Sequence, residues 1–106
     1  MTDIIQVITT TADKNVANKI ARALVEKRLA ACAQVSGPIT SCYWWKGKIE
    51  TSTEWRCLIK TRRGLYPQIE QAIVELHPYE VPAILAVPVV EGSQSYLKWM
   101  DEEMGK

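Results

Sequence analysis

The chain has 106 residues, of which 47% are hydrophobic and 24% charged, a composition typical of a soluble globular protein. This length suits one domain, so we expect residues 1–106 to form a single domain. The formal net charge of +1 disfavours nucleic acid as the main partner, because proteins that neutralise many phosphates are usually far more basic. No apolar run is long enough to span a membrane and no secretory leader is visible, which predicts a cytoplasmic protein without a membrane partner.

The three cysteines, Cys32, Cys42 and Cys57, lie far apart along the chain. Their number is odd and no two of them form a CxxC pair, so they match neither a zinc or redox motif nor a disulfide framework. We expect reduced thiols that serve as small apolar side chains.

Residues 3–12 alternate loosely and are rich in β-branched side chains, which predicts a strand. Asp13 can cap the helix that follows, over residues 13–30, where apolar residues recur at i, i+3 and i+4 spacing. Lys27 and Arg28 are expected in its last turn, where the helix dipole favours cations.

Residues 31–62 are predicted to form a long β-hairpin, interrupted in its first arm at Gly37-Pro38 because proline cannot donate to the strand ladder. The large apolar side chains fall mainly at odd positions on both arms, and cross-strand partners must share a face. A three-residue loop, Lys46–Lys48, keeps one face apolar, whereas a two-residue turn would mix apolar and charged side chains. The predicted pairs are Trp45 with Ile49 and Ile39 with Trp55.

Residues 64–77 carry apolar side chains on one helical face, and Pro78 predicts that this helix ends at His77. Residues 81–92 are almost continuously apolar, which predicts a strand buried on both faces, while its prolines favour an edge position or a bulge. Ser93 or Ser95 is expected to cap a short last helix. The predicted packing side of that helix consists of Tyr96, Leu97, Trp99 and Met100.

The predicted fold class is α+β, in the ferredoxin-like order βαββαβ with an extra C-terminal helix. An arm from Ala33 to Trp45 would span roughly 40 Å, whereas a compact domain of this length is about 33 Å across. The hairpin should therefore overhang its own domain and expose the aromatic tip around Tyr43 and Trp44, which predicts an oligomer. The alternative is a hairpin that folds back onto its own helices.

His77 is the only histidine, so catalytic triads are restricted to it, and neither a serine nor a cysteine lies near it in the sequence. No phosphate-binding glycine motif is present either, and we expect no enzymatic activity. As a metal ligand His77 has only Glu80 nearby, so other ligands would have to come from the hairpin or from another subunit. The alternative is a structural or interface histidine.

Five stretches occur in the order and spacing of the CutA divalent-cation tolerance family, which the chain resembles over nearly its whole length. They are ALVEKRLAACAQV, TSCYWWKGKIE, IKTR, HPYEVPAI and YLKW. The resemblance implies a homotrimer in which long hairpins wrap neighbouring subunits, with a quaternary plan similar to that of the PII signalling proteins. It also implies a non-enzymatic role in tolerance to divalent cations such as copper, with no obligatory cofactor and weak binding of copper or zinc.

The chain departs from the metal-binding relatives that it resembles at three positions. Thr9 stands where those relatives have a cysteine, Leu76 replaces the first of two histidines, and Ala83 replaces a glutamate of many relatives. These differences weaken the expectation of a metal site, above all one with soft ligands.

Residues that match the shared pattern would cluster in clefts between subunits, if the chain assembles as the family does. They are Cys32, Tyr43, Trp45, Glu54, Lys60, His77 and Tyr79. Such a cleft could hold a metal ion or, in a PII-like module, a small anion. Alternatively, these residues only hold a structural or protein-interaction trimer together, with Lys60 and Glu54 as an interfacial ion pair.

Overall fold

The computed structural model describes residues 2–104. Its strands and helices follow the predicted order, with one short 3-10 helix, η1, added before the second α-helix. The elements are β1 (Ile4–Thr11), α1 (Lys14–Glu26), β2 (Cys32–Trp45), β3 (Lys48–Arg62), η1 (Arg63–Leu65), α2 (Tyr66–Leu76), β4 (Ile84–Pro88) and α3 (Gln94–Glu103).

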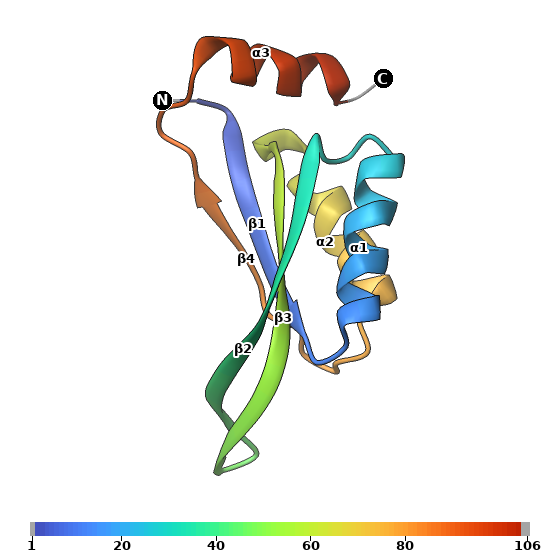
Figure 1. Ribbon diagram of the computed structural model, residues 1–106, viewed down its shortest axis with the longest axis vertical. Coiled ribbons are helices and arrows are strands. Elements are labelled where there is room, and N and C mark those ends of the chain that lie inside the picture. The colour runs from blue at the N-terminus through green and yellow to red at the C-terminus, as the bar shows by residue number, and fades with distance from the viewer. Residues whose placement is uncertain (1, 105–106) are drawn as a thin grey trace.

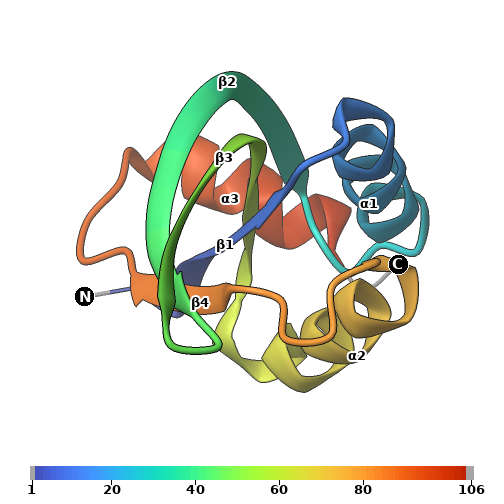
Figure 2. The same cartoon turned by 90° about the horizontal axis from the view of Figure 1, so that it is seen from below.

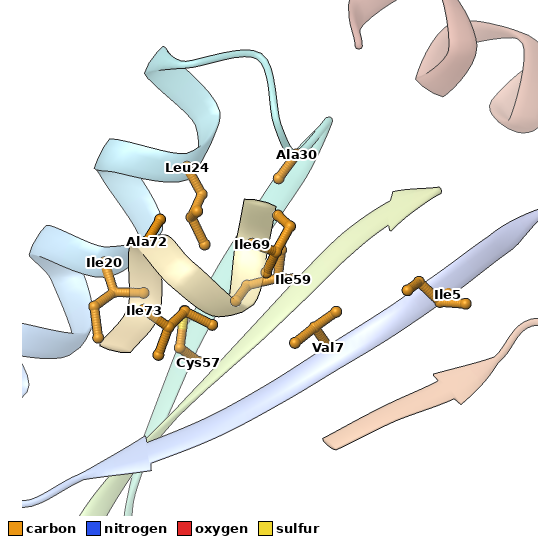
Figure 3. Packing of buried hydrophobic residues seen from close by; sticks show 10 residues of the cluster. All are labelled: Ile5, Val7, Ile20, Leu24, Ala30, Cys57, Ile59, Ile69, Ala72 and Ile73. Carbon is orange, nitrogen blue, oxygen red and sulfur yellow. The ribbon is translucent and has the colours of Figure 1, made fainter. Parts of the chain in front are cut away.

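The four strands form one antiparallel sheet in the order β2-β3-β1-β4, which is the ferredoxin-like arrangement predicted. Helices α1 and α2 cover one face of this sheet (Figures 1 and 2). The main core lies between this face of the sheet and the two helices. There Val7 of β1 and Ile59 of β3 meet Ile20 of α1 and Ile73 of α2 (Figure 3).

The start of α1 and the end of α2 follow from local sequence. The Asp13 side chain accepts a 2.8 Å hydrogen bond from the backbone N–H of Asn15, which confirms it as the cap of α1. Helix α1 ends at Glu26, so Lys27 and Arg28 lie beyond its last turn, contrary to prediction. Their expected place in the helix is lost because Arg28 takes a left-handed backbone conformation, with φ of 60°. His77 is extended and ends α2, as Pro78 dictates.

The sheet face opposite α1 and α2 carries an apolar row. Ile8 lies opposite Leu58 of β3 and Leu85 of β4, and all three alternate with residues that point to the core. Leu85 is 68% exposed, so within a single chain the last strand is not buried on both faces as predicted. The strand pairs only with β1 and therefore lies at the sheet edge, as its prolines indicated. It is also shorter than predicted.

The β2–β3 hairpin overhangs the rest of the molecule, as predicted. It extends well past the ends of both core helices (Figure 1), and the longest dimension of the chain is 45 Å against 25 and 23 Å for the others. Its tip exposes Trp44 at 72% and Ile49 at 62%. The hairpin is therefore not folded back onto its own helices.

The predicted register of the hairpin tip is wrong. The connection is the two-residue turn Lys46-Gly47, so Trp45 lies opposite Lys48 and Trp44 opposite Ile49. Both turn residues have positive φ, 49° and 80°, a backbone geometry that matches the twist of paired strands. As a consequence Ile49 shares a face with Trp44 and Lys48 shares the opposite face with Trp45, so the large apolar side chains of the tip are not gathered on one face.

An irregularity in β2 absorbs the change of register between the two halves of the hairpin. Ser36 lies opposite Arg56 and Ile39 opposite Glu54, so Gly37 and Pro38 together face one residue of β3. The predicted pairing of Ile39 with Trp55 is wrong because the register set by the two-residue turn continues unbroken from Trp45 to Ile39. Nearer the core, odd positions again oppose odd ones, and the helix-facing side stays apolar.

Helix α3 packs across one end of the sheet (Figure 1), with Ser93 as its cap. Met100 is buried against Ile4, and Leu97 packs beside them. Tyr96 and Trp99, which were also predicted to pack inward, are exposed by about 40%. They stack on each other with their ring centroids 5.5 Å apart, and the Tyr96 hydroxyl lies 3.3 Å from the ammonium group of Lys60 on β3.

Candidate functional site

A pocket of about 920 Å³ lies where the overhanging part of the hairpin faces the loop between α2 and β4. One wall comes from residues 41–45 of β2 and from Ser52 and Glu54 of β3. The facing wall is the loop from Tyr79 to Ala83, and the end of β1 contributes Thr10. Three separate stretches of the chain build this pocket.

The pocket combines aromatic walls with acidic side chains. Its aromatic residues are Tyr43, Trp44, Trp45 and Tyr79. Glu54 and Glu80 supply carboxyl groups, and no lysine, arginine or histidine lies among the described lining residues. Its own electrostatics therefore favour a cation over an anion.

Glu54 is the buried acidic group of this site. It is only 5% exposed, and its Oε2 accepts a 2.8 Å hydrogen bond from the Tyr79 hydroxyl. Burial, then the hydrogen bond and the charge of Glu54, raise the pKa of Tyr79 to about 12. Tyr79 thus remains a neutral donor to the carboxylate over the whole physiological range.

His77 lies behind the pocket wall, and both of its ring nitrogens are engaged. Its Nε2 is 2.7 Å from the carbonyl oxygen of Thr10, which can only accept, so Nε2 carries the proton. Its Nδ1 accepts the backbone N–H of Tyr79 at 3.2 Å. A metal ion could therefore reach an imidazole nitrogen only by displacing one of these hydrogen bonds. In this arrangement His77 ties the loop after α2 to β1.

The structure brings together only part of the predicted cleft set. Tyr43, Trp45, Glu54 and Tyr79 line the pocket, and His77 contacts Tyr79 edge-to-face at 4.7 Å. Cys32 and Lys60 do not join them within one chain. They lie opposite each other on β2 and β3, towards α3, where the Lys60 ammonium is 3.3 Å from the Tyr96 hydroxyl. Lys60 is six positions along β3 from Glu54, a distance of roughly 20 Å.

The residues of one chain do not fit a closed metal site. No group of three or more histidine, cysteine, aspartate or glutamate side chains is placed to hold an ion within residues 2–104. Glu80 lines the pocket, but Ala83 beside it has no ligand atom. Leu76 packs against the main core, and Thr9 is fully buried on the helix-facing side. A metal ion would need ligands from outside the chain to complete its coordination.

The three cysteines lie in different environments, and only Cys57 is a buried apolar side chain as expected. All three are free, with Cys42 exposed, Cys32 partly buried and Cys57 buried. Burial raises the pKa of the Cys57 thiol to about 11, which makes it an inert core residue. Cys42 lines the pocket but has no partner cysteine close to it in the sequence.

Sequence reasoning missed much of the pocket wall. Val81 to Ala83 were assigned to a strand, whereas they form a loop against the hairpin, and Ser41 and Ser52 carried no signal at all. The HPY sequence was the available clue, because a helix stop followed by two prolines must leave an irregular segment.

Comparison with known proteins gives a consistent result over most of the chain. A family model described as CutA1 divalent ion tolerance protein matches residues 5–103. The divalent-cation tolerance protein CutA of Thermus thermophilus is 41% identical over 99 residues, 93% of this chain and 96% of that protein. Human protein CutA is 47% identical over 91 residues, and the chain spans about half (51%) of its length.

Solved structures agree with the sequence matches. The Thermus thermophilus protein superposes with a TM-score of 0.93 at 40% identity, covering 96% of this chain and 99% of that one. A CutA from Archaeoglobus fulgidus, described as a periplasmic divalent cation tolerance protein, gives 0.91 at 36% identity, covering 94% and 97%. Within residues 2–104, no helix combines the length and apolar character needed to cross a membrane.

Proposed function

Because the chain belongs to the CutA1 divalent ion tolerance protein family, we propose that it acts as a non-enzymatic homotrimer in divalent-cation tolerance. In this proposal the pocket beneath the hairpin lies at a subunit boundary and binds a divalent cation, copper or zinc, weakly. The observation that carries the proposal is the acidic pocket itself. It places Glu54 and Glu80 around a hollow without a cationic side chain among its described lining residues.

Three exposed features support assembly. The apolar row of Ile8, Leu58 and Leu85 has no cover from α1 or α2. Strand β4 leaves one edge unpaired, and the hairpin tip presents Trp44 to solvent. Exposed apolar surface of this kind on a small protein is a usual sign of a protein interface. A closed ring would cover the sheet face, and its hairpins would reach across to the neighbouring subunits.

Weak rather than tight metal binding follows from the ligands that the chain supplies. Two carboxylates, one of them already accepting a hydrogen bond from Tyr79, leave most coordination positions to water or to a neighbouring subunit. Because both nitrogens of His77 are engaged, we propose that Glu54 and Glu80, not His77, are the first protein ligands.

The PII-like alternative, binding of a small anion, receives no support from the chain's own residues. Lys60 is the cationic residue among those that match the family pattern, and it lies towards α3 rather than in the pocket. An anion would have to draw its positive partner from another subunit. A purely structural or interaction trimer remains the outcome if neither kind of ligand binds.

For the location of the protein in the cell we propose the cytoplasm, as the free thiols suggest.

Two measurements test the proposal. Light scattering at micromolar concentration should give three times the chain mass, and a monomer would contradict the assembly. Calorimetric titration of chelator-treated protein with copper and zinc should show weak binding that Glu80→Gln reduces and His77→Ala leaves unchanged. Loss of binding in His77→Ala, with Glu80→Gln unaffected, would return the site to the histidine. No binding of either metal would favour the structural trimer.

A further inference from the structure

The pocket has a property that a metal ion alone does not use. Its walls are largely aromatic and apolar, and its buried charge is the single carboxylate of Glu54. A buried carboxylate with only a neutral hydroxyl partner creates a strong local preference for positive charge. Aromatic faces also attract cations, because the ring quadrupole is negative above the plane.

One ring of the pocket already shows this attraction within the chain. The ammonium group of Lys46 lies 5.5 Å from the centroid of the Trp45 ring, although Lys46 itself is not part of the pocket wall. Close approach of a cation to Trp45 is therefore compatible with the local geometry.

We propose that this pocket binds a small organic cation, a quaternary ammonium or similarly weakly hydrated group carried on an apolar or aromatic body. Its positive centre lies near Glu54, and its body lies against Tyr43, Trp45 and Tyr79. The inference rests on the proposed function only for the location of the site, and it adds a ligand class that differs from a metal ion.

Hydration separates the two ligand classes. A divalent metal ion must replace the water it loses with oxygen, nitrogen or sulfur ligands, and the aromatic walls supply few of these. A quaternary ammonium ion has no such requirement, and it gains from both the carboxylate and the aromatic faces. The volume of about 920 Å³ lies within the range of small-molecule pockets.

The test uses three probes with similar aromatic bodies and different charge. Benzyltrimethylammonium is the cation, benzyl alcohol the neutral compound and phenylacetate the anion, each titrated calorimetrically into the 106-residue protein. We expect saturable binding of the cation, and affinity at least about ten-fold weaker for the other two, since neither of them gains from the carboxylate or the aromatic faces as a cation does.

The variant Glu54→Gln should weaken binding of benzyltrimethylammonium at least about ten-fold, because it removes the charge while its amide oxygen can still accept the Tyr79 hydroxyl. Glu50→Gln is the matched control. Glu50 is exposed on the same strand outside the pocket wall, and its substitution should leave binding unchanged. Glu80→Gln, at an exposed position of the loop, reports on the pocket even if Glu54→Gln folds poorly, and it should weaken binding a few-fold.

Equal binding of the cation and benzyl alcohol, or unchanged binding in both glutamate variants of the pocket, would overturn the proposal. The proposal would also be overturned if the unsubstituted protein did not bind benzyltrimethylammonium and the oligomer dissociated in Glu54→Gln. These two results together would mean that a cationic side chain of a second copy occupies the pocket. Such results would agree with the proposed trimer and contradict only this inference. A protein that is monomeric and binds benzyltrimethylammonium would instead contradict the trimer and support this inference.

Discussion

Tyr79 donates its phenolic hydroxyl to Oε2 of Glu54 across 2.8 Å and thereby joins the loop after α2 to strand β3. Burial, followed by this hydrogen bond and the carboxylate charge, raises the pKa of Tyr79 to about 12 from an ordinary value of 10.0. We expect one tyrosine to ionise last in an alkaline titration followed by tyrosinate absorbance. That step should be absent from Tyr79→Phe.

The same shift makes stability depend on pH in one direction. Between pH 10 and 12 the folded protein keeps the Tyr79 proton that the unfolded chain has lost, so the free energy of unfolding falls as pH rises. This contribution is fully present below pH 10. Tyr79→Phe should show a shallower alkaline loss of stability in urea unfolding. An identical alkaline profile for both proteins would contradict the assigned contact.

Two buried threonines differ in a single respect. The Thr61 hydroxyl donates a 2.6 Å hydrogen bond to the carbonyl of Leu29, whereas the Thr9 hydroxyl is fully buried with no partner among the described residues. We expect Thr9→Val to raise the free energy of unfolding by about 1 kcal/mol, because it removes an unsatisfied polar group of similar shape. Thr61→Val should lower it by about 1–2 kcal/mol.

Urea unfolding at one fixed protein concentration compares the two variants, since assembly makes stability depend on concentration. Opposite signs are the expected result. Changes of the same sign and size would mean that the Thr9 hydroxyl is satisfied in solution.

Gly37 is required where β2 changes register. Its φ is +149°, and a Cβ there would lie 2.8 Å from Cε3 of Trp55 and 3.1 Å from the carbonyl oxygen of Glu54. We expect Gly37→Ala to lower the free energy of unfolding by about 1–3 kcal/mol through backbone strain and steric conflict. Gly64→Ala is the control, because a Cβ added there would meet nothing within 4 Å beyond its chain neighbours, and it should change stability by less than about 0.5 kcal/mol. Similar losses in both variants would refute this role of Gly37.

Substitutions at Leu85 and Val74 test whether the sheet face or the helix face forms the subunit interface. Both side chains are exposed, Leu85 on β4 in the uncovered apolar row and Val74 on α2. If three sheets pack face to face, Leu85→Glu should shift the light-scattering mass towards that of a monomer, because a charge would be buried in the interface. Val74→Glu should leave the mass unchanged. A trimer that tolerates Leu85→Glu would place the interface elsewhere.

The fold was predictable because its signals are local. Asp13 marks the start of α1 and Pro78 the end of α2, since a cap and a ring constraint act within a few residues. The hairpin tip was not predictable from apolar alternation, because a left-handed conformation at Lys46 and Gly47 selects the two-residue turn. Which residues of β2 and β3 lie opposite each other then changes at the irregularity near Gly37, which shifts the register of one half of the hairpin against the other.

The candidate site was predictable only in part. Tyr43, Trp45, Glu54 and Tyr79 were selected from motifs, and they line one pocket. Cys32 and Lys60 came from equally prominent motifs but lie at the other end of the sheet. Motifs identify residues that matter without stating which of them meet, because position along a strand sets their separation at about 3.3 Å per residue.

The sequence by itself determined the order of the elements, the start of α1, the end of α2 and the overhang of the hairpin, because propensity, capping and strand length are properties of short segments. Only the tertiary structure decided the chemistry of His77 and of the pocket. Whether an imidazole is free to bind depends on a carbonyl of β1, 67 residues away in the chain, and on the backbone of Tyr79. Whether Glu54 is buried without a cation depends on how the hairpin, β1 and the loop after α2 come together in space.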